Sequence, residues 1–236
     1  MIEIKGLRKS FGSKEVLHGL DLTIQDGELF GFIGHNGAGK TTTIRAMVGI
    51  LDFEAGSIMM NAKSIQTQAQ EVKKEIAYIP DNPDLYPNLT GEKYLNFIAD
   101  IFEVDAEART TLMKKYADEF ELTDNLGDLI SSYSHGMRQK LALISAFIHN
   151  PKILILDEPF VGLDPKASHT LKKMMEELCS QGGIVFFSTH VLEVVEKLCN
   201  RVAIIKNGSI VVDGITEEVV GQKSLEEVFL ELIEHE

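Results

Sequence analysis

The chain has 236 residues, 44% of them hydrophobic and 25% charged, which excludes a disordered polymer and suffices for one large domain or a core with an added lobe. Its 23 lysines and arginines are outnumbered by 36 aspartates and glutamates, and the net charge of −13 argues against nucleic acid as a partner. The chain has no leader-like amino terminus and no run of about 18 apolar residues, so we expect any membrane role to be peripheral.

The amino-terminal part of the chain favours strands. We predict strands over residues 2–5, 20–25 and 28–33. Asp26 and Gly27 stand between the last two segments and predict a two-residue hairpin turn. A β-rich region therefore precedes the first motif that carries chemistry.

That motif occupies residues 34–41, which read Gly-His-Asn-Gly-Ala-Gly-Lys-Thr and match the pattern G-x-x-x-x-G-K-[ST] between a strand and a predicted helix over 42–49. The glycines allow successive N–H groups to point at an anion near the positive end of the helix. Lys40 supplies a positive charge to the β- and γ-phosphates, and the Thr41 hydroxyl can ligate Mg²⁺. The motif predicts a nucleotide phosphate site and leaves open whether the nucleotide is hydrolysed.

Two more short strands are predicted over residues 56–61 and 75–79, and the residue composition changes after them. The proline-rich segment 80–87 then predicts a hinge or a lobe boundary.

Beyond this boundary, apolar residues recur with helical spacing in 94–102 and 112–120. We therefore predict that residues 88–150 form an all-helical insertion, with 1–87 and 151–236 as a catalytic α/β core.

The α/β pattern returns at residues 152–157, whose branched apolar side chains indicate a strand buried on both faces of a parallel sheet. Further strands are predicted over 184–188 and 201–206, with helices over 166–181 and 191–198. This alternation is typical of a parallel sheet covered by helices.

Two local signals organise the end of the chain. Asn207 and Gly208 predict a hairpin turn into a strand over 209–213. Ser224 and Glu227 form a capping box ahead of a helix, whose apolar stripe we expect to dock on the core.

Two adjacent carboxylates end the strand over 152–157, at the edge where open α/β sheets place their ligands. Asp157 suits a contact with Mg²⁺, and Glu158 is then the candidate base that orients the attacking water. Pro159 predicts an extended conformation for Glu158. His190 follows another strand, where it either bonds the γ-phosphate or is structural.

The order of these motifs resembles that of an ABC ATPase domain over essentially the whole chain. The resemblance implies a single domain with a P-loop NTPase core (a RecA-like parallel sheet), an N-terminal antiparallel β subdomain and a helical insertion that carries the signature motif. Residues 5–12, Lys-Gly-Leu-Arg-Lys-Ser-Phe-Gly, and residues 225–232, Leu-Glu-Glu-Val-Phe-Leu-Glu-Leu, resemble segments of the ATPase subunits of bacterial multidrug, sodium, copper or antibiotic exporters of the ABC-2 type. The segments that match the Walker A, signature, Walker B, D-loop and H-loop motifs are residues 34–41, 134–139, 153–158, 162–164 and His190.

The resemblance also implies partners. ABC ATPases act as head-to-tail pairs that bind ATP between the P-loop of one subunit and the signature of the other. The resemblance therefore implies two partners: a second ATPase subunit, identical or different, and a separate integral-membrane permease. It also implies that the chain lies peripherally on the cytoplasmic face of the cell membrane. The residues it implies for ATP binding are Phe11, Val16, Asn36, Gly37, Ala38, Gly39, Lys40, Thr41, Thr42, Ser134, Gly136 and Met137.

Within this resemblance, Glu158, His190 and Lys40 take catalytic roles. Thr41, Asp157 and Asp81 are the expected Mg²⁺ contacts, and these three residues complete a site for ATP and Mg²⁺.

Two residues depart from the family pattern. Asp81 stands where the Q-loop has a glutamine, so an anion replaces a neutral amide. His135 stands where the signature has its first glycine, and its side chain must point away from the phosphate or add a donor.

Other classes of protein fit less well. The main alternative is a soluble ABC ATPase that acts as a mechanical switch in DNA repair or translation, although those relatives usually carry coiled-coil arms or a second cassette. A GTPase would need an Asn-Lys-x-Asp motif, a small-molecule kinase would not need the signature, and a non-catalytic module would bind ATP without turnover.

Overall fold

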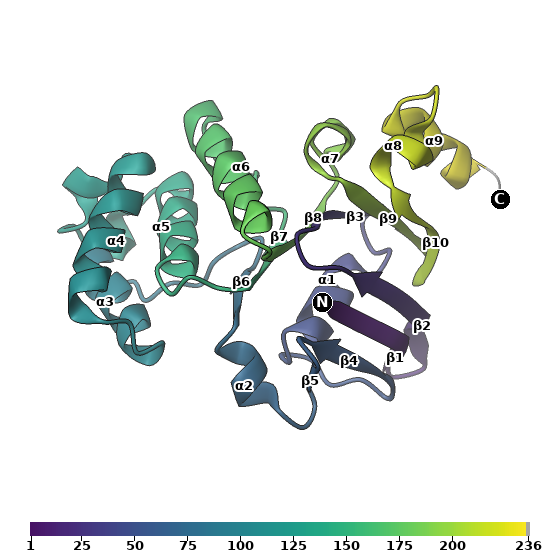
Figure 1. Ribbon diagram of the computed structural model, residues 1–236, viewed down its shortest axis with the longest axis horizontal. Helices are drawn as coiled ribbons and strands as arrows, with labels where there is room; N and C mark the ends of the chain where they lie inside the picture. The colour runs from purple at the N-terminus through teal and green to yellow at the C-terminus, as the bar shows by residue number, and fades with distance from the viewer. Residues whose placement is uncertain (235–236) are drawn as a thin grey trace.

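The computed structural model describes residues 1–234. The chain forms two β-sheets, which are flanked by helices (Figure 1). The four-stranded sheet has the order β2-β1-β4-β5, and the six-stranded sheet has the order β10-β9-β3-β8-β7-β6. The strands are β1 (Ile2–Phe11), β2 (Lys14–Ile24), β3 (Leu29–Ile33), β4 (Ala55–Met60), β5 (Lys63–Ser64), β6 (Ile76–Ile79), β7 (Ile153–Asp157), β8 (Ile184–Thr189), β9 (Arg201–Lys206) and β10 (Ser209–Ile215). The helices are α1 (Lys40–Met47), α2 (Ala69–Lys73), α3 (Gly91–Ile101), α4 (Ala106–Glu119), α5 (His135–Phe147), α6 (Pro165–Ser180), α7 (Leu192–Leu198), α8 (Thr216–Val220) and α9 (Leu225–Glu234).

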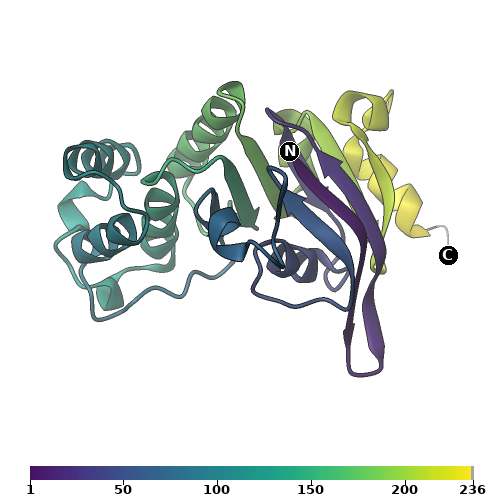
Figure 2. The ribbon, with the colours of Figure 1, turned by 60° about the horizontal axis from the view of Figure 1, so that its bottom comes forward.

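The four-stranded sheet is antiparallel and is dominated by one long hairpin. Strands β1 and β2 pair from Ile2 opposite Ile24 to Phe11 opposite Lys14, and their turn projects away from the helical lobe in Figure 2. Ile2 and Ile4 are buried while Glu3 is only half-buried, as expected for a sheet with one face on a core. The first strand therefore runs well beyond the predicted segment 2–5.

The predicted hairpin at Asp26 and Gly27 is wrong. Strand β2 belongs to the antiparallel sheet, whereas β3 lies between β8 and β9 in the other sheet and runs parallel to both. All five residues of β3 are buried, and both of its edges are paired, one with β8 and one with β9, so no edge is left for β2. The turn at residues 26–27 passes the chain from one sheet to the other.

The six-stranded sheet is parallel except for its edge strand β10. That strand pairs antiparallel with β9 through the turn at Asn207 and Gly208, which confirms the predicted hairpin. Every residue of β7 and β8 is buried, because α5 and α6 pack on one face of these strands and α1 and the antiparallel sheet pack on the other. The predicted strands over 56–61, 75–79, 152–157, 184–188 and 201–206 are all present within a residue or two.

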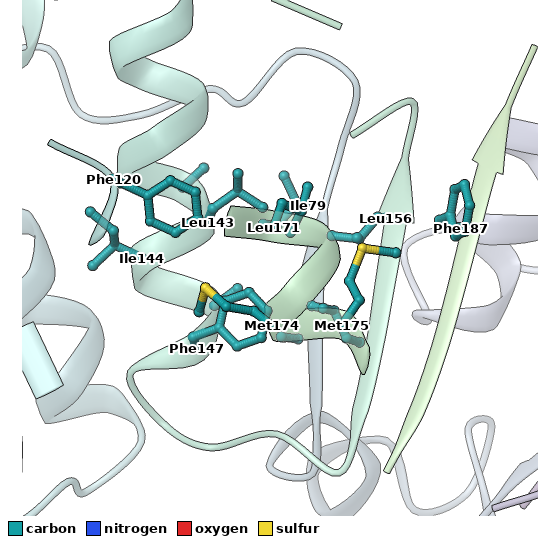
Figure 3. Close-up of a cluster of buried hydrophobic side chains, with 14 of the residues drawn as sticks. Ile79, Phe120, Leu143, Ile144, Phe147, Leu156, Leu171, Met174, Met175 and Phe187 are labelled. Atoms are coloured by element: carbon teal, nitrogen blue, oxygen red, sulfur yellow. The ribbon is translucent and has the colours of Figure 1, made fainter. Parts of the chain in front are cut away.

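Between β6 and β7 the chain forms α3, α4, α5 and two short 3₁₀ turns, η1 (Thr123–Asn125) and η2 (Ile130–Ser132). Apolar side chains of this helical lobe share one cluster with α6 and the six-stranded sheet. Figure 3 shows the contact: lobe residues meet α6 and the strands β6, β7 and β8 through Phe120, Leu143, Ile144, Phe147, Leu171, Met174, Met175, Ile79, Leu156 and Phe187. The helical insertion is therefore held to the core by continuous packing.

The end of the chain is anchored by the predicted capping box. The Ser224 hydroxyl accepts from the backbone N–H of Glu227 at 3.1 Å, and the Glu227 carboxylate accepts from the N–H of Ser224 at 2.7 Å. Leu225 is fully buried, which confirms that the stripe of α9 docks on the core. Within residues 1–234, no helix is both long enough and apolar enough to cross a bilayer.

Candidate functional site

The phosphate motif forms a tight loop between the end of β3 and the start of α1. Gly39 precedes the helix at φ 116°, a left-handed conformation that disfavours any side chain. A Cβ at Gly39 would also lie 2.8 Å from Leu17 Cδ2. The left-handed φ is what favours glycine at this position, since the nearest atom is the end of a flexible side chain.

Lys40 opens α1 and is buried, with 7% of its surface exposed. Its ammonium donates to the carbonyls of Gly34 at 2.7 Å and His35 at 3.3 Å, so the loop's own backbone holds the charge. Burial lowers the pKa of Lys40, and the negative charges of Glu158 and Asp157 oppose that shift. The arrangement places one desolvated cation inside the loop, where a phosphate can replace the carbonyls.

Asp157 is the next buried charge, with 3% exposure at the end of β7. Its Oδ2 accepts from the Thr41 hydroxyl at 2.9 Å, and its Oδ1 accepts from the Ser188 hydroxyl. Ser188 lies directly opposite Asp157 in the pairing of β7 with β8. Sequence reasoning did not single out Ser188; only its place at the end of a strand next to β7 would have suggested it.

Glu158 and His190 meet at the same edge of the sheet. The Glu158 Oε2 lies 2.9 Å from Nδ1 of His190 and accepts from the His190 backbone N–H at 3.3 Å. His190 therefore holds the Glu158 carboxylate, whose side chain also lines the cavities at this edge of the sheet.

The prediction of an extended Glu158 is wrong, because its φ is +50°. Its N–H donates to the Ser188 carbonyl at 3.0 Å, and its carbonyl accepts from the N–H of Val161 at 3.2 Å. Pro159 disfavours the right-handed helical region for Glu158, and these two hydrogen bonds select the left-handed region for the turn. Such a conformation costs of the order of 1–3 kcal/mol in a non-glycine residue and is concentrated at functional sites.

A cavity of about 380 Å³ brings most of the predicted residues together at the carboxyl ends of β3 and β7. An adjoining cavity shares Asn36, Asp81 and Glu158 and adds His190. The side chain of Ala38 is buried behind the loop. The predicted residues that line the first cavity are Phe11, Val16, Asn36, Gly37, Gly39, Lys40, Thr41, Thr42, Asp81, Asp157 and Glu158.

Phe11 and Val16 bring the β1–β2 hairpin to this cavity. Phe11 ends β1 and is 51% exposed, and the Lys9 ammonium lies 5.3 Å from its ring centroid. An exposed ring beside a phosphate site offers a face on which a planar base can stack.

The predicted residues of the signature lie elsewhere, at the start of α5. The Ser134 hydroxyl accepts from the Met137 N–H at 3.2 Å, which confirms the expected helix cap. Neither Ser134, Gly136 nor Met137 lines the cavity that holds Lys40.

His135 points to the segment that follows Glu158. A Cβ at Gly162 would lie 2.4 Å from His135 Cδ2, and a Cβ at Gly136 would lie 2.8 Å from the Gly162 carbonyl. Lys140 and Asp164 add an ion pair of 2.6 Å between the same two segments. The start of α5 is thus tied to the loop that carries Glu158.

The comparisons with known proteins agree with this geometry. A family profile described as ABC transporter matches residues 17–161. The chain is 38% identical over 211 residues to the uncharacterized ABC transporter ATP-binding protein YdbJ of Bacillus subtilis, covering 89% of this chain and 68% of that protein. It is 31% identical over 219 residues to the Nod factor export ATP-binding protein I of Burkholderia lata, covering 93% and 72%. A solved structure of the ATP-binding subunit of an ABC transporter superposes with a TM-score of 0.95 at 32% identity, over 99% of this chain and 100% of the other.

Proposed function

This chain belongs to the ABC transporter family as one of its ATP-hydrolysing subunits, and we propose that it dimerises on ATP and drives a separate permease that exports its cargo. The observation that carries the proposal is that Lys40, the Thr41–Asp157 pair and Glu158 line one cavity, and that His190 contacts Glu158 from the adjoining cavity. Lys40 is suited to binding phosphate, Thr41 and Asp157 to binding a metal ion, and Glu158 to activating water.

ATP binds with its phosphates in the loop over 34–41 and its base toward Phe11 and Val16. The Lys40 ammonium leaves the carbonyls of Gly34 and His35 and bonds the β- and γ-phosphates, because a charge-assisted bond to an anion is stronger than one to a neutral carbonyl. The stacking of the base on Phe11 adds affinity without reading base identity.

The oxygen-only donor set at Thr41 and Asp157 fits Mg²⁺, which prefers hard oxygen ligands. Thr41 and Asp157 would hold the metal, with Asp81 lining the same cavity as a further carboxylate. When bound, Mg²⁺ supplies positive charge to the phosphate oxygens. Ser188 keeps Asp157 oriented by bonding its other oxygen.

Glu158 orients the attacking water and accepts its proton as the bond from the γ-phosphorus to the leaving ADP oxygen breaks. His190 is within hydrogen-bonding distance of Glu158 through Nδ1 and so holds the carboxylate at the edge of the cavity. The adjoining cavity, which contains both side chains, is where that water and the γ-phosphate would lie.

The position of the signature supports dimerisation. Ser134 caps α5 in the helical lobe and does not line the cavity of its own chain. A helix start with a capped first turn is a site for an anion. The second subunit then places its Ser134 against the γ-phosphate bound by the first.

Contact with the permease is proposed on the segment from Asp81 to Tyr94, at the boundary between core and lobe. Tyr86 and Phe97 are exposed, and their rings meet edge to face at 5.6 Å beside a groove that Pro87 and Leu89 also line. An apolar groove of this kind can accept the apolar face of a helix. The proposal places the chain at the cytoplasmic face of the cell membrane. The similarity to a Nod factor export protein supports export as the direction of transport.

The test is purification of the chain from its own membranes in mild detergent, with identification of accompanying proteins by mass and measurement of ATP turnover. We expect a polytopic membrane protein that raises turnover above that of the isolated subunit. A soluble assembly without such a protein would instead support the mechanical switch. Charge-reversing substitutions at Asp81 or Asp84 that leave coupling intact would place the permease contact elsewhere.

A further inference from the structure

We propose that Gly208, in the turn between β9 and β10, is a positioning residue that sets the distance between the phosphate loop and the base end of the cavity. The inference rests on the proposed ATP site and adds a residue that does not line it. One peptide segment touches both halves of the site: the Gly208 N–H donates to the Ala38 carbonyl at 2.9 Å, and the Gly208 carbonyl accepts from the His18 N–H at 2.9 Å.

These two partners belong to different parts of the nucleotide site. Ala38 lies in the phosphate loop between Gly37 and Gly39, both of which line the cavity. His18 lies in β2, two residues after Val16, which lines the base end. The turn therefore connects the segment that holds phosphates with the segment that faces the base.

The turn has no spare room. A Cβ at Gly208 would lie 2.1 Å from the Val16 carbonyl oxygen and 2.6 Å from His18 Cδ2, and its φ is +75°. The nearest atom belongs to the backbone of a paired strand, so it cannot rotate away as a side-chain end would. A side chain at this position must push β2 away from the turn or the turn away from Ala38.

The preceding strand supports the same loop. A Cβ at Gly34 would lie 2.5 Å from the Ile205 carbonyl, so the end of β9 lies directly behind the first residue of the phosphate loop. The β9–β10 hairpin is thus a backbone support for the loop. Glu158 and His190 instead follow β7 and β8. Displacing the turn should therefore weaken ATP binding more than it slows the chemical step.

The experiment compares Gly208→Ala with Gly182→Ala. Gly182 has a similar left-handed φ of +85°, but a Cβ there would meet no atom within 4 Å. Both variants carry the strain of alanine at positive φ, and only the first displaces the nucleotide site. We expect Gly208→Ala to raise the Kd and KM for ATP about tenfold with kcat within about threefold, and Gly182→Ala to leave all three unchanged.

Equal ATP affinity in Gly208→Ala and the unmodified chain would overturn the inference, as would equal weakening in both variants. If Gly208→Ala does not fold, amide hydrogen exchange on the unmodified chain gives the same test. ATP should slow exchange at Gly208 and His18, and leave unchanged the N–H of Gly27, which bonds the Gly183 carbonyl at 3.0 Å. No slowing with ATP bound would overturn the inference. A chain that binds no ATP at all would overturn the proposed function first.

Discussion

The two ends of the six-stranded sheet each border a cavity, and the larger one is not where the chemistry gathers. The cavity at the amino ends of the strands measures about 600 Å³, and Asp26, Glu75 and Lys152 line it. The cavity at the carboxyl ends measures about 380 Å³ and contains Lys40 and Glu158. The difference lies in how the charged groups of each cavity are held.

At the amino ends, charge is neutralised by permanent partners. Hydrogen bonds from Asn61 and Lys63, together with Lys152, lower the pKa of Glu75 to about 2. At the carboxyl ends, the hydrogen bonds of the desolvated Lys40 ammonium within residues 1–234 go to the carbonyls of Gly34 and His35, and Glu158 keeps a strained φ. Charges whose partners a ligand can replace indicate a site better than the volume of a cavity does.

The largest effect should come from Glu158→Gln. The amide cannot accept the proton of the attacking water, so kcat should fall about 10²- to 10³-fold while ATP binding is kept. Steady-state turnover and ATP affinity measure the two quantities. Glu75→Gln, at the other end of the sheet, is the matched control and should turn over ATP normally. If Glu158→Gln hydrolysed ATP as fast as the parent, the assignment of the base would be wrong.

The second-largest effect should come from Lys40→Ala, which removes the buried ammonium that is proposed to bond the phosphates of ATP. We expect ATP affinity to fall about 100-fold, as when one member of a buried charge pair is removed. Titration calorimetry with ATP measures this. Lys152→Ala removes a lysine at the amino ends and should leave affinity unchanged. Comparable losses in the two variants would contradict the proposed difference between the ends.

A smaller effect, on stability and not on activity, is expected from Glu75→Gln. The folded state lowers the pKa of Glu75 from 4.5 to about 2, so the ionised carboxylate stabilises the fold fully above pH 4.5. That contribution is lost as the pH falls from 4.5 toward 2. We expect the variant to be less stable by about 1–2 kcal/mol at pH 7, and the gap to narrow below pH 4.5. Urea unfolding at pH 7 and pH 3 checks this, and a gap that widens on acidification would refute it.

The smallest effect is expected in the larger cavity itself. Lys115 lines that cavity, and its ammonium lies 5.0 Å from the Tyr116 ring centroid. Lys115→Ala should change kcat and ATP affinity by less than about twofold, since surface charges away from a site contribute little. A large loss of turnover would show that the amino ends of the sheet also serve the reaction.

Much of the fold follows from local patterns. The buried strands, the Asn207–Gly208 hairpin and the capping box at Ser224 could be predicted because each depends on residues that are neighbours in the chain. The predicted hairpin at Asp26 and Gly27 is wrong, because a turn motif shows that the chain bends and does not show which strand will pair with which.

The candidate site likewise has one part that could be predicted from neighbouring residues and another that depends on contacts between distant segments. The phosphate loop is one contiguous segment, so its residue types alone indicate that it binds a nucleotide phosphate. The left-handed φ of Glu158 and the contact of His135 with Gly162 arise between segments that are distant in the chain. They could not be inferred from composition or periodicity.

The order of residues was enough to establish an α/β nucleotide-binding chain with a helical insertion, because hydrophobic periodicity and the phosphate motif act over short stretches. The tertiary structure decided that Ser188 orients Asp157 and that Gly208 bridges Ala38 and His18. Those contacts depend on strand order and register, which are selected by burial across the whole sheet.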